Sequence, residues 1–216
     1  MGLADELLII HRAITRALGV AHERGQQYAE RGFGDAVAEK GYRDFGRCLV
    51  RLVNAHHDAE EEIIFPRLRP LMTSVPFAEL EAQHHELHDS LDATAAALDS
   101  ADAGAAAGAW LDRFVPAIGR VRASWTAHIA VEEAHVTQPA IDAALDGAAQ
   151  GELAKTISER AQKNSHTPQL TIPFVLYNLG PGDRAHLQGR FPAQLVGMVD
   201  GPWKEQWAPM KCLLLD

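Results

Sequence analysis

The chain has 216 residues, 47% of them hydrophobic, so it can bury a substantial core as one domain or as one domain with a small lobe. Its formal net charge of -9 opposes any general attraction to nucleic acid or to an anionic membrane surface. No apolar run approaches the roughly 18 residues that span a bilayer. We therefore expect a globular protein that binds neither nucleic acid nor membranes.

The chain start and the cysteines favour a reducing compartment. The first ten residues, MGLADELLII, carry two acidic residues and no basic segment, which makes them a poor secretory signal. The two cysteines, Cys48 and Cys212, are far apart and form no CxxC pair. We expect a cytoplasmic protein in which Cys48 is a small buried residue.

Apolar residues recur at intervals of three and four through the first 150 residues, a spacing typical of amphipathic helices. A first helix is predicted from about Leu3 to Arg31, before a glycine-containing turn. A second is predicted to begin at Asp35 or Tyr42 and to run to about Ile63, before two prolines loosen it.

Two more helices complete the predicted set. The third begins at Phe77 and fades beyond Leu98, and the fourth runs from Leu111 to about Leu145. Four long helices joined by short loops predict an all-α, up-down-up-down four-helix bundle over residues 1–148.

The remaining residues, 149–216, differ in character. Prolines and glycines divide them into pieces of about a dozen residues or fewer, and short helices are predicted near 152–162, 183–189 and 202–215. Aromatic residues, among them Trp203 and Trp207, give this extension apolar surface to bury. We expect it to pack on the bundle as an ordered cap.

Each of the four apolar stripes carries at least one histidine, and two carry a glutamate four residues after it. The residues concerned are His11, His56, Glu60, His84, His88, His128 and Glu132. Residues four apart lie about one helical turn apart and can reach one ion or two neighbouring ions. Imidazoles and carboxylates together suit transition metals better than calcium or magnesium, and iron is the leading candidate.

The buried carboxylates are the hardest feature to explain without a metal. An isolated ionised carboxylate in a core is costly unless it is paired or bound to a cation, and no lysine or arginine shares these stripes. A lone histidine on an apolar face is ordinarily a packed core residue. Metal ions, however, would account for all seven residues at once.

Several neighbouring residues compete for these roles. His57 with Glu61 has the same spacing as His56 with Glu60, but residues 56–66 echo residues 128–139, and the echo favours His56. Helical geometry places Glu132 about 40° around the axis from His128, against about 140° for the residue that follows it, Glu133.

Two other histidines lie outside this set. His85 falls on a polar face and is expected to be exposed. His135 is as consistent with orienting a ligand as with simple packing.

Three segments resemble the hemerythrin-like, or HHE cation-binding, family: HHDAEEEIIFP at 56–66, the HxxxH pair at 84–88 and HxxxEE at 128–133. The resemblance covers residues 1 to about 145. It implies a left-handed four-helix bundle around a non-haem di-iron centre, with two iron ions joined by an oxo or hydroxo bridge, five histidine ligands and two bridging carboxylates. Carried over by position, it assigns His11, His56, Glu60, His84, His88, His128 and Glu132 to the irons.

Such a centre implies a protein that binds or reacts with O2, peroxide or NO, for oxygen binding, sensing or oxidative-stress handling. One alternative is a di-iron oxidase or oxygenase acting on a small organic substrate between the bundle and the extension. Another is an iron-sensing or interaction module. Fold alone does not decide between these, because function depends on the site.

Overall fold

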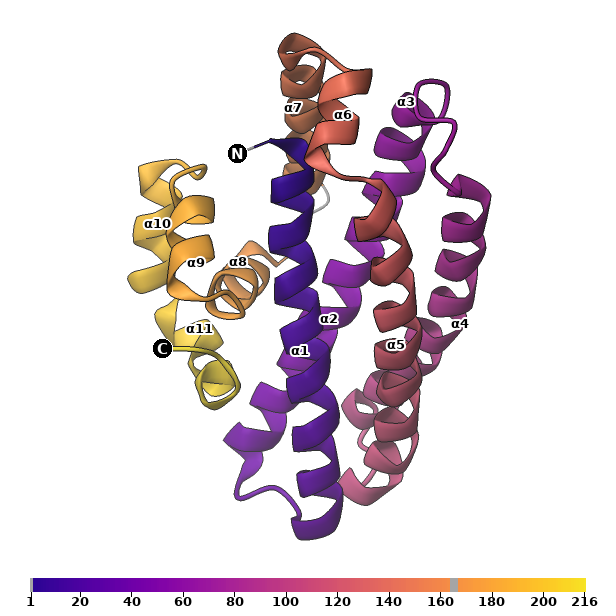
Figure 1. The fold of residues 1–216 in the computed structure, drawn as a ribbon. Coiled ribbons are helices and arrows are strands. Elements are labelled where there is room, and N and C mark those ends of the chain that lie inside the picture. The colour runs from indigo at the N-terminus through magenta and orange to yellow at the C-terminus, as the bar shows by residue number, and fades with distance from the viewer. Residues whose placement is uncertain (1, 164–166) are drawn as a thin grey trace.

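The computed structural model describes residues 2–163 and 167–216, and its core is a bundle of four long helices (Figure 1). These are α1 (Leu3–Arg31), α2 (Ala36–Ala59), α4 (Phe77–Asp102) and α5 (Ala107–His135). α5 packs against both α1 and α4, and α2 packs against the same two helices, which closes the bundle. The predicted all-α bundle is confirmed.

The ends of the first helices follow from local chemistry. α1 ends at Gly32, whose φ of 75° is strained for residues with a side chain. α2 is capped by Asp35, whose carboxylate accepts a hydrogen bond of 2.7 Å from the Ala38 amide. This cap decides between the two predicted starts in favour of Asp35.

α2 does not end as a regular helix. It continues into a π-helical turn, η1 (Glu60–Ile64), and then into the short helix α3 (Phe65–Leu68). Pro66 lacks an amide hydrogen, and in a regular helix its ring would clash with the carbonyl four residues earlier. The wider turn before it removes this conflict.

The prediction of one helix from Leu111 to about Leu145 is wrong. α5 ends at His135, and a separate helix, α6 (Gln138–Ala144), follows. Pro139 lies in the first turn of α6, where its missing amide hydrogen is tolerated, and Thr137 caps that turn. A continuous helix would have placed this proline in an interior turn.

The bundle core has two apolar clusters. The larger one contains Ile14, Val53, Leu87 and Trp125, and the smaller one, nearer the N-terminus and α6, contains Leu3, Ile64, Leu80 and Val136. On every long helix the predicted metal ligands lie between residues of the larger cluster and residues of the smaller one. A polar layer therefore crosses the bundle between two apolar layers.

The extension is built of short helices: α7 (Gly147–Lys163), α8 (Pro168–Tyr177), α9 (Pro181–Gln188), α10 (Ala193–Asp200), α11 (Lys204–Trp207) and the 3₁₀ helix η2 (Ala208–Leu213). The three predicted segments are helical. α8 and α10 were not predicted, because prolines open or interrupt these apolar stretches. α7 runs through the position at which the sequence suggested a domain boundary.

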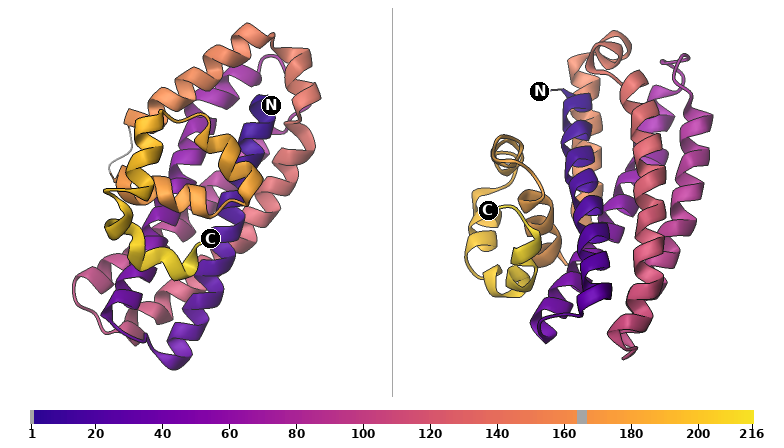
Figure 2. Two further views of the ribbon diagram at one scale, coloured as in Figure 1. Left: turned by 90° about the vertical axis from the view of Figure 1, so that its left-hand side faces the viewer. Right: turned by 60° about the horizontal axis from the view of Figure 1, so that its bottom comes forward.

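The extension lies against α1 and α2 (Figure 2). Phe174, Trp207, Met210 and Leu213 are buried within the larger core cluster, which agrees with the expected packing on the bundle. At Gly41 of α2, an added Cβ would come within 2.0 Å of the Pro209 carbonyl oxygen, so the close approach of η2 requires glycine.

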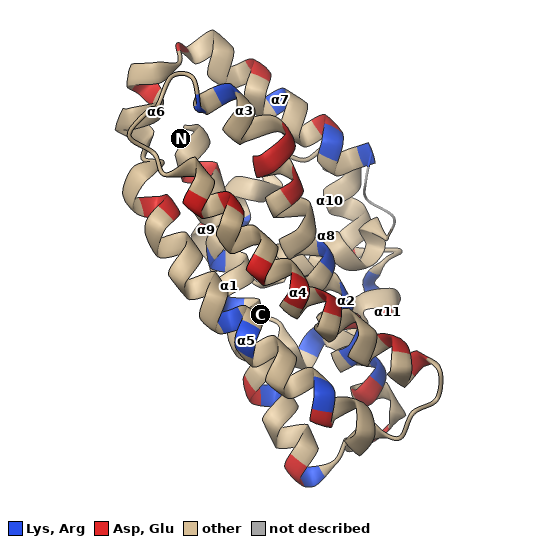
Figure 3. Ribbon diagram, turned by 90° about the vertical axis from the view of Figure 1, so that its right-hand side faces the viewer, with Lys and Arg blue, Asp and Glu red and all other residues tan. Residues whose placement is uncertain are grey.

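The surface carries both signs of charge. On the face that includes α4 and α5, basic and acidic residues are interspersed, and no broad basic area appears on that face (Figure 3). Among the described residues, no helix is both long enough and apolar enough to cross a membrane.

Candidate metal centre

Two groups of buried side chains meet in the polar layer. The first contains His11, His56, Glu60 and Glu132, and the second contains His57, Glu60, His84 and His128. Within each group the candidate ligand atoms all lie within 4.8 Å of one another. All four long helices or their continuations contribute, and Glu60 belongs to both groups.

Glu60 lies between the two groups and approaches histidines of both. One carboxylate oxygen lies 3.1 Å from His56 Nε2 in the first group, and the other lies 3.3 Å from His84 Nε2 in the second. The side chain is completely buried. A carboxylate with one oxygen in each group can link two ions.

Glu132 faces Glu60 from the opposite side of the bundle. Its Oε2 lies 3.2 Å from His11 Nε2 and 3.7 Å from His128 Nε2, so it also approaches histidines of both groups. Burial and the proximity of Glu132 raise the pKa of the Glu60 carboxyl, which favours a proton on Glu60 when no cation is present. A cation would replace that proton.

Most of the inward-facing atoms have no hydrogen-bond partner. The buried atoms without one include His11 Nε2, His56 Nε2, both ring nitrogens of His57, both carboxylate oxygens of Glu60, and Glu132 Oε2. Buried polar atoms are nearly always paired, and a cluster of unpaired atoms around one small volume is exceptional. Metal ions bound there would give these nitrogen and oxygen atoms partners, so the residues fit a metal centre.

The histidine pair in the second group supports the same conclusion. His84 Nδ1 donates a hydrogen bond of 2.8 Å to Glu61, and His128 Nδ1 donates one of 3.2 Å to Gln83. With both Nδ1 atoms protonated, the neutral rings direct their Nε2 lone pairs towards each other across 3.2 Å. A cation between the rings turns this repulsion into coordination.

In the first group, the strongest electrostatic effect is the pairing of His11 with Glu132 and Glu133. Burial alone disfavours the imidazolium, but the neighbouring carboxylates of Glu132 and Glu133 outweigh it and raise the pKa of His11 to about 9. The same contact with His11 outweighs burial at Glu132 and lowers the pKa of that carboxyl. At Glu60, burial and the nearby Glu132 raise the pKa well above its ordinary value.

The other histidines are held neutral, which is the form that binds metals. Burial, followed by the proximity of His11, lowers the pKa of His56 far below its ordinary value, and burial with His84 does the same for His57. Burial and His84 lower the pKa of His128 to about 4. Apart from His11, the site therefore presents unprotonated imidazole nitrogens at neutral pH, and a metal ion would displace one proton from His11.

Aromatic rings wall the layer. The Trp125 ring lies 5.5 Å from His11, 5.6 Å from His56 and 5.9 Å from His57, between ring centroids, and its indole N–H donates to Thr15 Oγ1 at 2.9 Å. Phe65 stacks on the outer face of His84 at 5.6 Å. These rings limit the orientations that the imidazoles can adopt.

The structure brings together six of the seven predicted residues, all except His88. His88 is half-buried and belongs to neither group, although its ring lies 5.9 Å from that of His57. His57, the less favoured alternative to His56, is completely buried in the second group, while His56 lies in the first. The two adjacent histidines therefore face different groups.

The glutamate alternatives separate in a similar way. Glu132 lies in the first group, whereas Glu133 and Glu61 are partly exposed and accept hydrogen bonds from the outer nitrogens of His11 and His84. The signal for this arrangement was the doubled glutamate in each HxxxEE segment. His85 is exposed as predicted, and the exposed His135 donates to the Val131 carbonyl of its own helix.

Comparison with known proteins gives one match. The family model Hemerythrin HHE cation binding domain matches residues 3–138, a segment that contains both histidine and glutamate groups. Searches of curated proteins and of solved structures found no match. With well over half of its length matched and a buried cluster of metal-ligating side chains inside that segment, this chain belongs to the hemerythrin HHE cation-binding domain family.

Proposed function

We propose that the protein is a non-haem di-iron protein that binds or reacts with O2, peroxide or NO. The observation that carries this proposal is the pair of buried groups that share Glu60. Two ions would be held by His11, His56, Glu60 and Glu132 on one side and by His57, Glu60, His84 and His128 on the other. Membership of a cation-binding family supports metal binding itself.

The donor set favours iron. Neutral imidazoles with carboxylates suit divalent iron, and a bound di-iron pair supplies electrons and an open coordination position to small diatomic or peroxidic molecules. The chain's own contribution is to keep His56, His57, His84 and His128 unprotonated, to place Glu60 between the two groups and to surround the groups with apolar layers. We infer that apolar layers on both sides favour small apolar ligands such as O2 over larger organic substrates.

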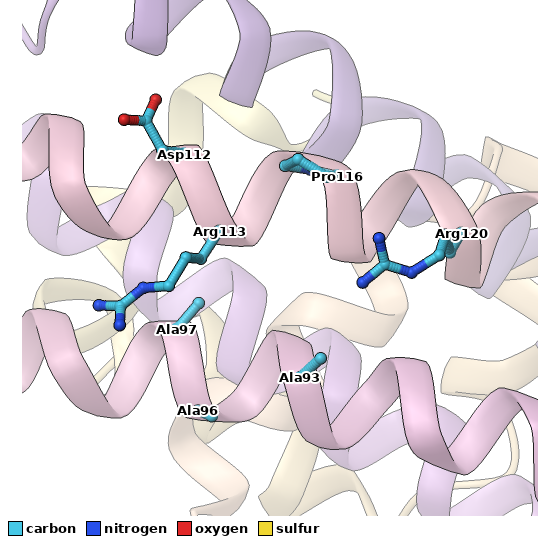
Figure 4. Close-up of a pocket in the computed structure, with 7 residues that line it drawn as sticks. All are labelled: Ala93, Ala96, Ala97, Asp112, Arg113, Pro116 and Arg120. Carbon is cyan, nitrogen blue, oxygen red and sulfur yellow. The ribbon is translucent and has the colours of Figure 1, made fainter.

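The oxygenase alternative requires room for an organic substrate, so the position of two cavities bears on it. An oxygenase needs a substrate cavity on the order of 300 Å³ or more beside its metal. One cavity of about 430 Å³ lies between α4 and α5, lined by alanines, Pro116 and two arginines (Figure 4). Another of about 340 Å³ lies between α2 and the extension. None of the lining residues belongs to the two groups.

Anaerobic reconstitution with Fe(II), followed by absorption spectra with O2, peroxide or NO, tests the proposal. Two irons per chain and a new charge-transfer band are expected. A band with O2 that disappears under vacuum indicates carriage, and rapid peroxide loss indicates a catalase-like role. The absence of iron uptake overturns the proposal, and turnover of an organic substrate favours the oxygenase alternative.

Matched variants connect the result to these side chains. His84→Gln and Glu132→Gln should each lower the iron content. His85→Gln changes the exposed neighbour of His84 and should leave the iron content unchanged. Equal iron content in all three variants would contradict the assignment.

A further inference from the structure

Each of the two HxxxEE segments contains a second glutamate that the proposed ligand set leaves out. Glu61 follows Glu60, and Glu133 follows Glu132. The side chains of Glu60 and Glu132 are 0% and 2% exposed, whereas those of Glu61 and Glu133 are 34% and 39% exposed. Consecutive helical residues project in different directions, so the second glutamate of each pair points away from the polar layer.

Both outer carboxylates turn instead to a histidine on a neighbouring helix. Glu61, on the π-helical turn, accepts a hydrogen bond of 2.8 Å from His84 Nδ1 on α4. Glu133, on α5, accepts one of 2.9 Å from His11 Nδ1 on α1. Among the described residues, the only ion pairs of Glu61 and Glu133 are with these two histidines.

The two contacts are equivalent in the two groups. His11 belongs to the first group and His84 to the second, so each group contains one histidine whose outer nitrogen is held by a carboxylate. When a proton is held on Nδ1, Nε2 is the ring atom left for a metal ion, which would displace any proton there. Nε2 points inward in both rings, 3.2 Å from Glu132 in His11 and 3.3 Å from Glu60 in His84. The outer contact therefore selects the tautomer that binds metal.

Charge adds a second effect. Glu60 and Glu132 alone supply two negative charges to two divalent ions, and Glu61 with Glu133 brings the total to four. A carboxylate behind an imidazole increases the basicity of the ring and favours a more highly charged metal. Hydrogen bonds to ionised groups are also stronger than those between neutral groups.

We propose that Glu61 and Glu133 are positioning residues, each of which fixes the ring of one metal-binding histidine and lowers the reduction potential of the bound iron. The inference rests on the proposed di-iron function. It explains why both sequence segments carry two glutamates: the first reaches the ions and the second holds a histidine that reaches them.

Paired substitutions separate the hydrogen bond from the charge. Glu61→Gln and Glu133→Gln keep an oxygen acceptor and remove the charge, while Glu61→Ala and Glu133→Ala remove both. Glu86→Gln and Glu86→Ala, at an exposed position on α4, are the matched controls. Circular dichroism of the metal-free proteins checks the fold, which should survive because both side chains are partly exposed.

Two quantities are measured on the full chain: Fe(II) affinity by competition with a chelator, and the midpoint potential of the bound iron. The alanine variants should bind Fe(II) about 10- to 100-fold more weakly, the glutamine variants should recover part of this loss, and all four should show a raised midpoint potential. The Glu86 variants should match the wild type in both quantities.

The two possible failures are distinguishable. Suppose that the wild type binds two irons, that the glutamine variants have the same midpoint potential as the wild type, and that the alanine variants have the same Fe(II) affinity. The inference is then overturned and the proposed function stands. If the wild type binds no iron, the proposed function itself fails.

Discussion

The adjacent residues His56 and His57 belong to different groups because the surrounding helices lie on different sides of α2. His56 and His57 point about 100° apart, and α2 packs against α1 on one side and α4 on the other. The His56 ring therefore meets His11 of α1 at 5.0 Å, while the His57 ring stacks on His84 of α4 at 4.1 Å. Each histidine joins the group on its own side.

This geometry predicts different effects for two histidines of similar sequence context. His57→Gln should lower iron content by about one ion per chain, because it removes one of three imidazoles from the second group. His88→Gln should leave both ions in place, since His88 is in neither group. Metal analysis after reconstitution with Fe(II) measures both, and a larger loss in His88→Gln would restore the ligand set that the family resemblance implied.

Six of the seven residues predicted from the sequence lie in the two buried groups, whereas His57 was the less favoured alternative and His88 lies outside both groups. The prediction assumed one apolar stripe per helix and therefore chose between His56 and His57. α2 instead buries two faces, one against α1 and one against α4. The angle around the helix axis predicted that Glu132 points towards His128 and that Glu133 points away from it, and the side chains lie in this way. Their hydrogen-bond partners lie on other helices, where spacing along one helix carries no information.

Among the elements, the π-helical turn has the greatest effect on the site. It carries Glu60, which approaches histidines of both groups, and Glu61, which reaches His84. α7 packs over this turn, and Arg160 pairs with Glu62 at 2.5 Å, which ties the extension to the same element. The turn ends where Pro66 disfavours a regular continuation of α2.

Replacing this proline should therefore weaken the site from outside it. Pro66→Ala removes the conflict that favours the π turn, so a regular helix becomes competitive and rotates Glu60 and Glu61 away from their partners. We expect at least about a tenfold loss of Fe(II) affinity, equivalent to roughly 1.4 kcal/mol. Chelator competition measures it. Pro70→Ala, in the exposed turn beyond α3, is the control and should bind as the wild type does.

The end of α5 shows a limit of periodicity. Apolar spacing continued to Leu145, but the proline at 139 imposed a break that periodicity did not register. The consequence is local. α6 packs against α1, and Ile141 joins the smaller core cluster on one side of the polar layer.

On the scale of the whole molecule, a polar layer between apolar layers makes the metal-free protein sensitive to acid. His128 has a pKa of about 4 in the folded chain, against 6.5 for an unperturbed imidazole. Between these values the unfolded chain binds more protons than the folded one, so stability rises with pH. The contribution of His128 is complete above about pH 6.5 and is lost as the pH falls towards 4.

A comparison of variants isolates the contribution of His128 to the pH dependence of stability. In chelator-treated protein, the free energy of unfolding should fall between pH 6.5 and 4, with His128 contributing up to about 1.4 kcal/mol per pH unit. His128→Gln should flatten the curve and His85→Gln should not. Glu60 has a raised pKa and acts in the opposite direction in all three proteins, so it cancels in the difference. Urea unfolding across this range measures the slopes, and equal slopes would contradict the prediction.

The extension shares the core of the bundle instead of forming one of its own. Phe174 is completely buried and its ring lies 4.9 Å from that of Phe45 on α2. Arg12 of α1 also makes two hydrogen bonds, of 2.6 and 2.8 Å, to Asp183 of α9, but such an exposed pair contributes about 1 kcal/mol or less. Apolar burial therefore dominates the attachment.

Phe174→Ala tests this attachment. The substitution leaves a cavity in the shared core and should lower the free energy of unfolding by about 3 to 5 kcal/mol. Phe191→Ala, at a half-buried position in the extension, should cost less. Urea unfolding should show a single transition in the wild type. An earlier separate transition for the extension would support two independent domains divided near residue 148.

The helical bundle, the apolar stripes and the metal-ligating residue types could be predicted from the sequence, because they depend on spacing along single helices and on the cost of burying charge. Three features emerged from the folded structure: His56 and His57 face different groups, Glu61 and Glu133 accept hydrogen bonds from His84 and His11, and the extension packs on α1 and α2. These relations join residues of different helices, and they are set by how the helices pack against one another.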